Sequence, residues 1–210
     1  RHKDDWKKSV LMLRAKKQWY SDKQLARILS TKEEDIRAYR KSVSIVPKTN
    51  KIDTLAGEFP TDTNYLYLTY HGSKIQQSKK PEKKRILVLG SGGYRIGSSV
   101  EFDWCSVSSL WALRKLGYET IMLNYNPETV STDFDTSDIL YFDEINVETI
   151  LHIIEEESVS GVIISMGWQI ANNLAVELEK AWVHILGTTP ENIDRAEDRK
   201  KFSSLLDTIW

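Results

Sequence analysis

The chain has 210 residues, of which 40% are hydrophobic and 28% are charged, and its net charge is −1. This composition is that of a soluble globular protein with one medium or two small domains. No apolar run approaches the roughly 18 residues that span a bilayer, so a membrane protein is excluded. Cys105 is the only cysteine, which excludes an intrachain disulfide and favours a reducing compartment. We expect Cys105 to be a small buried hydrophobe on a helix.

Neither end of the chain has the pattern of a natural terminus. Residues 1–5 are charged, lack an initiator Met and precede no hydrophobic region, which excludes a signal peptide. The chain stops at Ile209-Trp210, within a segment patterned as a helix. We therefore expect the sequence to be a piece of a longer protein.

Charge divides the chain into unequal parts. Residues 1–77 hold 16 Lys and Arg against 9 Asp and Glu, a net of +7, and residues 78–85 hold 5 against 1, a net of +4. Residues 86–210 hold 8 against 20, a net of −12. This asymmetry indicates two units and does not favour a uniform nucleic-acid-binding surface.

The first 77 residues are predicted to form a small all-α domain. Trp6, Val10 and Leu13 recur at helical spacing. Ser21 with Gln24 has the form of a capping box that opens a second helix. The apolar face of this helix is predicted to consist of Leu25, Ile28 and Leu29.

A third helix is predicted after Thr31, which forms a similar pattern with Glu34. Pro47 ends the helical run. Residues 65–70 are predicted to be a short strand or an extended segment. The apolar stripe of the third helix is predicted to consist of Ile36, Tyr39 and Val43.

Residues 78–85 are predicted to be a linker because they are polar, charged and broken by Pro81. From residue 86 to 190, strand patterns alternate with helical patterns, which predicts βαβ units and a parallel sheet. The predicted fold class is therefore α/β, a Rossmann-like doubly wound parallel sheet preceded by the small all-α domain. The predicted strands are 85–90, 120–126, 139–142, 161–166 and 184–186, and the predicted helices are 99–116, 147–157, 170–180 and 191–207. In the helix over 99–116, the predicted buried stripe consists of Val107, Leu110, Leu113 and Leu116.

Three polar loops are predicted to meet at one edge of this sheet. They are Gly90–Gly93, residues 126–133 and Gly167–Gln169, and each follows a predicted strand. Open α/β sheets bind ligands at the carboxyl ends of their strands. We therefore expect a site at this rim, formed by Gly90, Gly92, Gly97, Asn126, Thr129, Ser131, Thr132, Gly167 and Gln169.

The glycine-rich turn has two interpretations by itself. Its backbone N–H groups can cradle an anion at a helix N-terminus, or the segment is only a tight turn. It departs from the dinucleotide fingerprint because Arg95 stands where a third glycine would fall. The next strand ends in Asn124-Tyr125-Asn126, without the acid that would hold a ribose. A nicotinamide-dependent dehydrogenase is thus an alternative that both departures disfavour.

Two acids near the start of the following helix also have two interpretations. Glu101 and Asp103 can belong to the site, or they can simply complement the helix dipole in its first turn.

A second alternative function is nucleic-acid binding. Residues 21–42 have helix-turn-helix spacing, with Ala26 and Ile36 at positions that such motifs bury. The would-be recognition helix opens with Glu33-Glu34-Asp35, which base edges and phosphates would repel.

Four motifs of the second half stand in an order, and at separations, that resemble a known family. They are residues 95–97 (RIG), 101–105 (EFDWC), 126–133 (NPETVSTD) and 194–199 (DRAEDR). Together they resemble the large subunit of carbamoyl phosphate synthetase, at the start of its second synthetase half. In the first half, residues 21–24, 52–56 and 63–67 resemble the oligomerisation domain that precedes that half.

The resemblance covers nearly the whole chain and implies how it is organised. Residues 1–77 would be the oligomerisation domain, 78–85 the linker, 86–190 the pre-ATP-grasp α/β domain, and 191–210 the start of a truncated ATP-grasp domain. It implies a carbon–nitrogen ligase whose parent makes carbamoyl phosphate from bicarbonate, glutamine-derived ammonia and two ATP, for arginine or pyrimidine biosynthesis.

The resemblance also implies cofactors and partners. ATP and Mg²⁺ (or Mn²⁺) would serve the parent, and the isolated chain is expected to bind neither and to be inactive. The partners would be the rest of the large subunit and a glutamine amidotransferase subunit or domain, in an oligomer, with no nucleic acid and no membrane. The location would be cytoplasmic, or mitochondrial as for some relatives.

Specific residues carry over from the family by position. Arg95, Glu101 and Glu128 match residues along an internal conduit for carbamate, and Arg199 matches an arginine that approaches the nucleotide. Carbamate decays quickly in water, so a shielded polar conduit is physically reasonable. We expect no catalytic residue and no metal ligand within this chain.

The sequence departs from the family at five positions. Gly93 stands where the family has proline, and four tryptophans stand where it has glycine: Trp19, Trp168, Trp182 and Trp210. An indole at position 168 is expected to overpack the neighbouring glycine-rich turn.

Overall fold

The computed structural model describes residues 9–60, 63–72, 81–93 and 100–209, without the side chains of residues 100–102. The chain forms two compact units, Arg1–Asn50 with Leu68–Gln77, and Lys51–Tyr67 with Ser78–Trp210. We call them the helical unit and the α/β unit. Each has a hydrophobic core of its own.

The helical unit packs its apolar positions into one core. Its helices are α1 (Ser9–Lys17), α2 (Asp22–Leu29) and α3 (Glu33–Ser42). The predicted capping box at α2 is confirmed, because Gln24 N–H donates to Ser21 Oγ (3.1 Å) and Ser21 N–H donates to Gln24 Oε1 (2.9 Å). The buried members of the core are Met12, Leu25, Ala26, Ile36 and Ile45.

Two predictions for this unit are wrong. Helix α3 begins after Lys32, which makes no side-chain cap, and the Thr31 hydroxyl donates instead to Asp35 (3.1 Å). Ile28 is 64% exposed. The contact between α2 and α3 covers only one side of α2, and Leu25 and Ala26 occupy that side.

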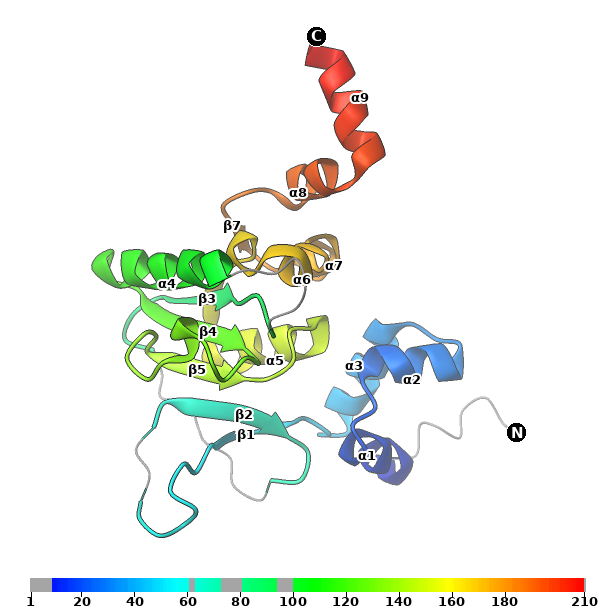
Figure 1. Ribbon diagram of the computed structural model, residues 1–210. Helices are drawn as coiled ribbons and strands as arrows, with labels where there is room; N and C mark the ends of the chain where they lie inside the picture. The colour runs from blue at the N-terminus through cyan, green and yellow to red at the C-terminus, as the bar shows by residue number, and fades with distance from the viewer. Residues whose placement is uncertain (1–8, 61–62, 73–80, 94–99, 210) are drawn as a thin grey trace. The chain divides into compact units, whose positions relative to one another are not determined.

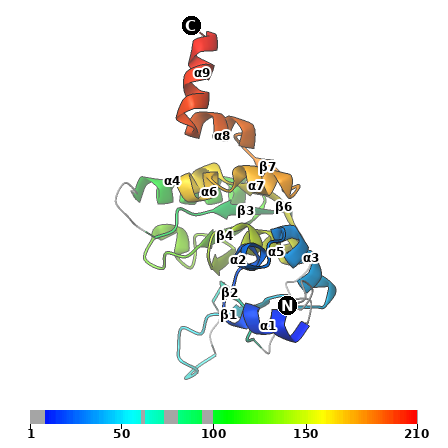
Figure 2. The same ribbon diagram turned by 90° about the vertical axis from the view of Figure 1, so that its right-hand side faces the viewer.

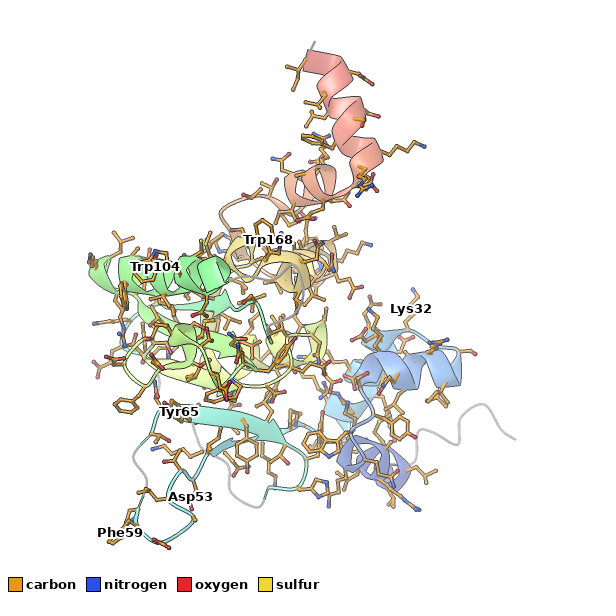
Figure 3. The ribbon with its side chains drawn as sticks, in the orientation of Figure 1. Lys32, Asp53, Phe59, Tyr65, Trp104 and Trp168 are labelled. Atoms are coloured by element: carbon orange, nitrogen blue, oxygen red, sulfur yellow. The ribbon has the colours of Figure 1, made fainter. Side chains whose placement is uncertain are left out.

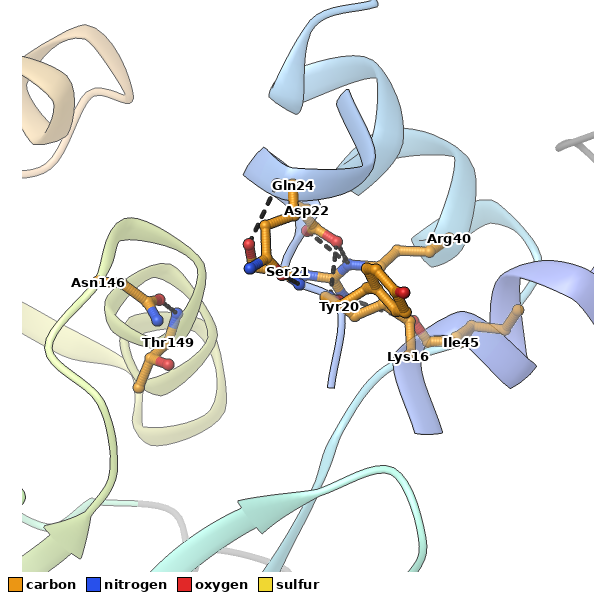
Figure 4. Close-up of polar contacts among 9 residues, drawn as sticks. All are labelled: Lys16, Tyr20, Ser21, Asp22, Gln24, Arg40, Ile45, Asn146 and Thr149. Carbon is orange, nitrogen blue, oxygen red and sulfur yellow. Dashed lines mark hydrogen bonds and ion pairs between the residues drawn. The ribbon is translucent and has the colours of Figure 1, made fainter. Parts of the chain in front are cut away.

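A buried ion cluster ties the helices of this unit together (Figure 4). Asp22 accepts a hydrogen bond from Lys16 Nζ (3.0 Å) and two from Arg40 Nε (2.9 and 2.7 Å), and all three side chains are at most 2% exposed. Lys16 Nζ also donates to the Tyr20 carbonyl and lies 5.2 Å from the centre of the Tyr70 ring. The Asp22 carboxylate therefore contacts buried cations of both α1 and α3.

The α/β unit is built on a parallel sheet, which confirms the predicted fold class. The seven-stranded sheet has the order β1-β2-β5-β4-β3-β6-β7, and each neighbouring pair from β2 to β7 is parallel (Figure 1). All five residues of the central strand β3 are buried. The strands are β1 (Lys48–Lys51), β2 (Tyr65–Thr69), β3 (Arg85–Leu89), β4 (Glu119–Asn124), β5 (Ile139–Phe142), β6 (Val159–Ile163) and β7 (Ile185–Leu186). Residues 48–50 of β1 and 68–69 of β2 fall within the helical unit.

Helices alternate with these strands. Figures 1 and 2 show α4, α6 and α7 together on one side of β3. The elements are α4 (Val100–Lys115), α5 (Val147–Glu157), α6 (Trp168–Asn172), α7 (Ala175–Lys180), α8 (Pro190–Glu197), α9 (Arg199–Ile209), and the 3-10 helices η2 (Val130–Thr132) and η3 (Ser165–Gly167). The Asn146 side chain caps α5 by accepting from Thr149 N–H (2.8 Å, Figure 4).

Two predicted helices are each divided in two, and several elements, β6 among them, have other bounds than predicted. The helix predicted over 170–180 is two short helices separated at Asn173-Leu174. The one predicted over 191–207 is broken at Asp198, whose extended backbone ends α8. Its carboxylate accepts Lys201 N–H and Lys200 N–H, both at 2.9 Å, and these bonds lower its pKa. Strand β6 starts and ends earlier than predicted because Ile164 already turns into η3.

Helix α4 buries most of its predicted stripe. Val107, Leu110 and Leu113 are buried, but Leu116 is 73% exposed because α4 ends at Lys115 and the chain turns at Gly117. The expectation that Cys105 is buried is also wrong, since its side chain is exposed.

Ion pairs lie at the amino ends of the strands. Arg85 at the start of β3 binds Glu119 (2.6 Å) and Glu157 (2.7 Å), and the Tyr141 hydroxyl donates to Glu157 (2.5 Å). Burial alone would raise the pKa of Asp138, but hydrogen bonds from Arg114 and Thr120 lower it. Charges at this edge of the sheet are thus used for stability.

Within the described part of the chain, no helix is long and apolar enough to cross a membrane.

The buried ion cluster gives a prediction for stability. Asp22→Ala removes a buried carboxylate that both Lys16 and Arg40 contact, which costs about 3–5 kcal/mol of unfolding free energy. The matched control Glu34→Ala removes an exposed first-turn acid of α3 and should cost less than about 1 kcal/mol. Urea denaturation followed by circular dichroism measures both. Equal losses in the two variants would contradict the assigned role of Asp22.

Candidate functional site

The three predicted loops do converge at the carboxyl edge of the sheet, and Asn124 is where two of them meet. Asn124 is the last residue of β4 and is fully buried. Its Oδ1 accepts hydrogen bonds from Gly92 N–H (3.0 Å), Tyr125 N–H (2.9 Å) and Asn126 N–H (3.4 Å). Its Nδ2 donates to Ser131 Oγ (3.2 Å). One amide therefore links the glycine-rich turn to the loop over 126–133.

The third loop packs against the glycine-rich turn through glycine. A Cβ at Gly167 would lie 2.7 Å from the Gly90 carbonyl oxygen and 2.8 Å from that of Leu89, and a Cβ at Gly90 would lie 2.6 Å from the Asn124 side chain. Only glycine permits these approaches. Ser106 of α4 adds a hydrogen bond to the Met166 carbonyl (3.3 Å).

The loop over 126–133 is held by its own polar side chains. Thr132 Oγ1 donates to the carbonyls of Asn126 (2.9 Å) and Thr129 (2.8 Å), and Glu128 N–H donates to Asn126 Oδ1 (2.9 Å). Asn126, Thr129, Ser131 and Thr132 are buried, whereas Glu128 is exposed. The loop is thus a compact support that presents the Glu128 side chain at the rim.

Of the other predicted site residues, some are exposed, and some lie outside the described residues or have no described side chain. Arg95 and Gly97 lie outside the described residues. Glu101 belongs to the first turn of α4, but its side chain is not described. Gln169 is exposed and donates to Asn173 of its own helical segment (3.0 Å).

Arg199 is the first residue of α9 and its side chain is exposed.

Sequence reasoning missed the two residues that organise the edge. The sequence singles out Asn124 only as lacking the charge of a ribose-binding acid, and it leaves open whether Asp103 belongs to the site or complements the helix dipole. Asp103 is 4% exposed, and its Oδ2 accepts the Ser131 N–H (2.9 Å). Both could have been recognised as polar residues at positions that the periodicity of the strand or helix places in the core.

The described residues do not fit a nucleotide phosphate at this edge. The Gly92 N–H, which would face an anion in a phosphate-binding turn, donates to Asn124 instead. An open pocket of about 450 Å³ at the same edge carries two carboxylates, which repel phosphate. It is lined by Tyr125, Phe142, Asp143, Glu144, Ile145 and Ile170. ATP is therefore assigned none of the described residues of this edge.

Three tryptophans have a backbone conformation that favours glycine. Trp19, Trp168 and Trp182 have φ of 66°, 54° and 62°, and Trp210 lies outside the described residues. Trp168 has ψ −146°, a combination that essentially only glycine adopts. Its indole is half exposed at the start of α6 (Figure 3). The expectation of overpacking is therefore wrong, and the cost at this position lies in the backbone.

Comparisons with known proteins agree with the motifs. The sequence model of the carbamoyl phosphate synthase pre-ATP-grasp domain matches residues 82–195. The chain is 54% identical over 199 residues to the mitochondrial arginine-specific carbamoyl phosphate synthase large chain of Neurospora crassa, covering 94% of this chain and 17% of that protein.

Multifunctional relatives are similar to the same extent. The chain is 55% identical over 199 residues to the multifunctional protein pyrABCN of Emericella nidulans, covering 95% of this chain and 9% of that protein. It is 52% identical over 198 residues to the multifunctional protein CAD of Squalus acanthias, covering 94% of this chain and 9% of that protein. The chain thus spans less than a fifth of the length of these relatives.

The glycine-like backbone at position 168 gives the second prediction. Trp168→Gly removes a backbone strain of about 1–3 kcal/mol, so the thermal midpoint should rise by about 2–6 °C despite the entropic cost of glycine. Trp104→Gly is the matched control, since Trp104 is similarly exposed but lies inside α4 (Figure 3), where glycine lowers stability. Differential scanning calorimetry compares them. If both midpoints fall, the backbone at Trp168 is not the source of strain.

Proposed function

Because the chain belongs to the carbamoyl phosphate synthase pre-ATP-grasp domain family, we propose that its α/β unit lines part of the path by which carbamate reaches the second phosphorylation site of a full-length synthase. The observation that carries the proposal is the match of the family model to residues 82–195, the segment that contains the three converging loops. The dehydrogenase and nucleic-acid-binding alternatives have no support in these comparisons.

The chemistry of the edge suits this role. Glu128 is a charged side chain presented at the rim by a loop whose other polar groups are buried. A carboxylate accepts hydrogen bonds from N–H groups more strongly than a neutral acceptor does, so Glu128 can guide a ligand that carries them. Because carbamate decomposes in water, the residues that guide it must be fixed in a passage shielded from solvent.

The other functional roles are assigned by similarity to the family. Glu101 and Arg95 would line the same path, and Arg199 would approach the nucleotide. ATP and Mg²⁺ or Mn²⁺ would be bound by the parts of the synthase that lie outside this chain, as phosphoryl transfer requires cationic clamps and metal ligands. The isolated chain would then be inactive.

The organisation of the parent protein completes the proposal. Residues 1–77 would mediate oligomerisation, 78–85 would link them to the pre-ATP-grasp domain over 86–190, and residues 191–210 would begin the ATP-grasp domain. The partners would be the remainder of the large subunit and a glutamine amidotransferase subunit or domain. The relatives named above include arginine-specific large chains and multifunctional proteins, so the pathway would be arginine or pyrimidine biosynthesis, in the cytoplasm or in mitochondria.

The experiment uses a chimera in which residues 1–210 replace the corresponding segment of the Neurospora crassa large chain. In this chimera, Glu128→Gln should keep ATP hydrolysis within about twofold and lower the carbamoyl phosphate formed per ATP by about tenfold, since misplacement of reactants by 1 Å can cost on the order of 10²-fold. Coupled assays of ADP and carbamoyl phosphate give this ratio.

The control is Glu179→Gln, which neutralises an exposed carboxylate of α7 and should leave the ratio unchanged. A ratio that Glu128→Gln leaves unchanged contradicts the proposed function. So does a chimera that stays inactive even when it also carries Trp168→Gly.

A further inference from the structure

The Asp103 carboxylate is buried more deeply than a helix-capping role requires. It lies in the second half of the first turn of α4, is 4% exposed, and accepts the Ser131 N–H at 2.9 Å through Oδ2. Its Oδ1 has no hydrogen-bond partner among the described residues. Acids that only complement a helix dipole work from the surface, whereas removing a carboxylate from water carries a large desolvation cost. A buried acid with one hydrogen-bond partner among the described residues therefore requires another explanation.

The position of the hydrogen bond between Ser131 and Asp103 offers an explanation for the buried carboxylate. Asp103 stands two residues after Glu101, and Ser131 stands three residues after Glu128. The bond between Asp103 and Ser131 therefore joins the helical turn that contains one proposed conduit carboxylate to the loop that contains the other.

Ser131 is held from a second direction by Asn124. The Ser131 N–H donates to Asp103 while its Oγ accepts from Asn124 Nδ2 (3.2 Å), and Ser131 itself is fully buried. Because Asn124 also accepts the Gly92 N–H, the loop is fixed between α4 and the end of β4. Functional groups need this kind of support, since a loosely held site loses its geometry.

We infer that Asp103 is a positioning residue that fixes the loop carrying Glu128 relative to the start of α4, and that Asn124 fixes the same loop from the sheet. The inference rests on the proposed function, because it concerns the same passage. The Asp103 side chain is almost wholly buried. It acts through the Ser131 backbone and so determines where Glu128 is presented.

The test compares two substitutions of similar size in the chimera. Asp103→Asn keeps an oxygen that can accept the Ser131 N–H. Asp103→Leu removes the acceptor. We expect the carbamoyl phosphate formed per ATP by Asp103→Asn to stay within about twofold of that of the unsubstituted chimera. Asp103→Leu should lower this ratio by about tenfold because the loop is displaced.

The ratio separates positioning from folding, because a loss of folded protein lowers both rates together and leaves their ratio unchanged. If Asp103→Leu does not fold, Asp103→Ala takes its place, since the smaller side chain leaves room for water. The inference is overturned if Asp103→Leu or Asp103→Ala forms as much carbamoyl phosphate per ATP as Asp103→Asn does. It is also overturned if Asp103→Asn forms as little carbamoyl phosphate per ATP as Asp103→Leu or Asp103→Ala.

The two proposals fail in different ways. If Glu128→Gln leaves the ratio unchanged, the conduit role itself is wrong. If Glu128→Gln uncouples the chimera and neither Asp103→Leu nor Asp103→Ala does, only the positioning role is wrong.

Discussion

The carboxyl edge of the sheet depends on the hydrogen bonds of one buried amide, that of Asn124. When parallel strands end, the segments that follow them carry N–H groups that no neighbouring strand can satisfy. Burying such groups without partners is costly. The Asn124 oxygen accepts three of them, and its nitrogen donates to Ser131. Two loops that are separate in the sequence are thereby held as one structure, to which Asp103 attaches helix α4.

The two edges of the sheet use polar groups differently. At the amino edge, Arg85 pairs with Glu119 and Glu157, so opposite charges compensate each other. At the carboxyl edge, the Asn124 amide, the Thr132 hydroxyl and the buried Asp103 carboxylate fix the backbone, and the Glu128 carboxylate is exposed. This division is expected of an open α/β sheet, in which the carboxyl edge meets ligands.

The layered fold could be predicted from the sequence because its signals are local. The apolar run at Arg85–Leu89 and the stripe of Val107, Leu110 and Leu113 each report burial directly. The break at Asp198 could not be predicted in this way, because the residues on both sides of it have helical patterns. Leu116 was misplaced because the stripe continues past the residue at which α4 ends.

The site was predicted in outline, and its organising residues were not. Convergence of the loops follows from topology, so Gly90, Ser131 and Gly167 could be named in advance. Asp103 could not be recognised, because an acid in the first turn of a helix has the same sequence pattern whether it is exposed or buried. Its role depends on a contact with Ser131, 28 positions away, which no local pattern encodes.

The central claim is that the carboxyl edge behaves as one cooperative structure. Native-state hydrogen exchange of the Gly92, Ser131 and Gly167 amides, measured by NMR on the 210-residue chain, tests it most directly. The account predicts that the three amides exchange with a common opening free energy, because Asn124, Asp103 and the contact of Gly167 with Gly90 link them. Three unrelated opening free energies, with Gly92 or Ser131 exchanging as fast as an exposed loop, would contradict it.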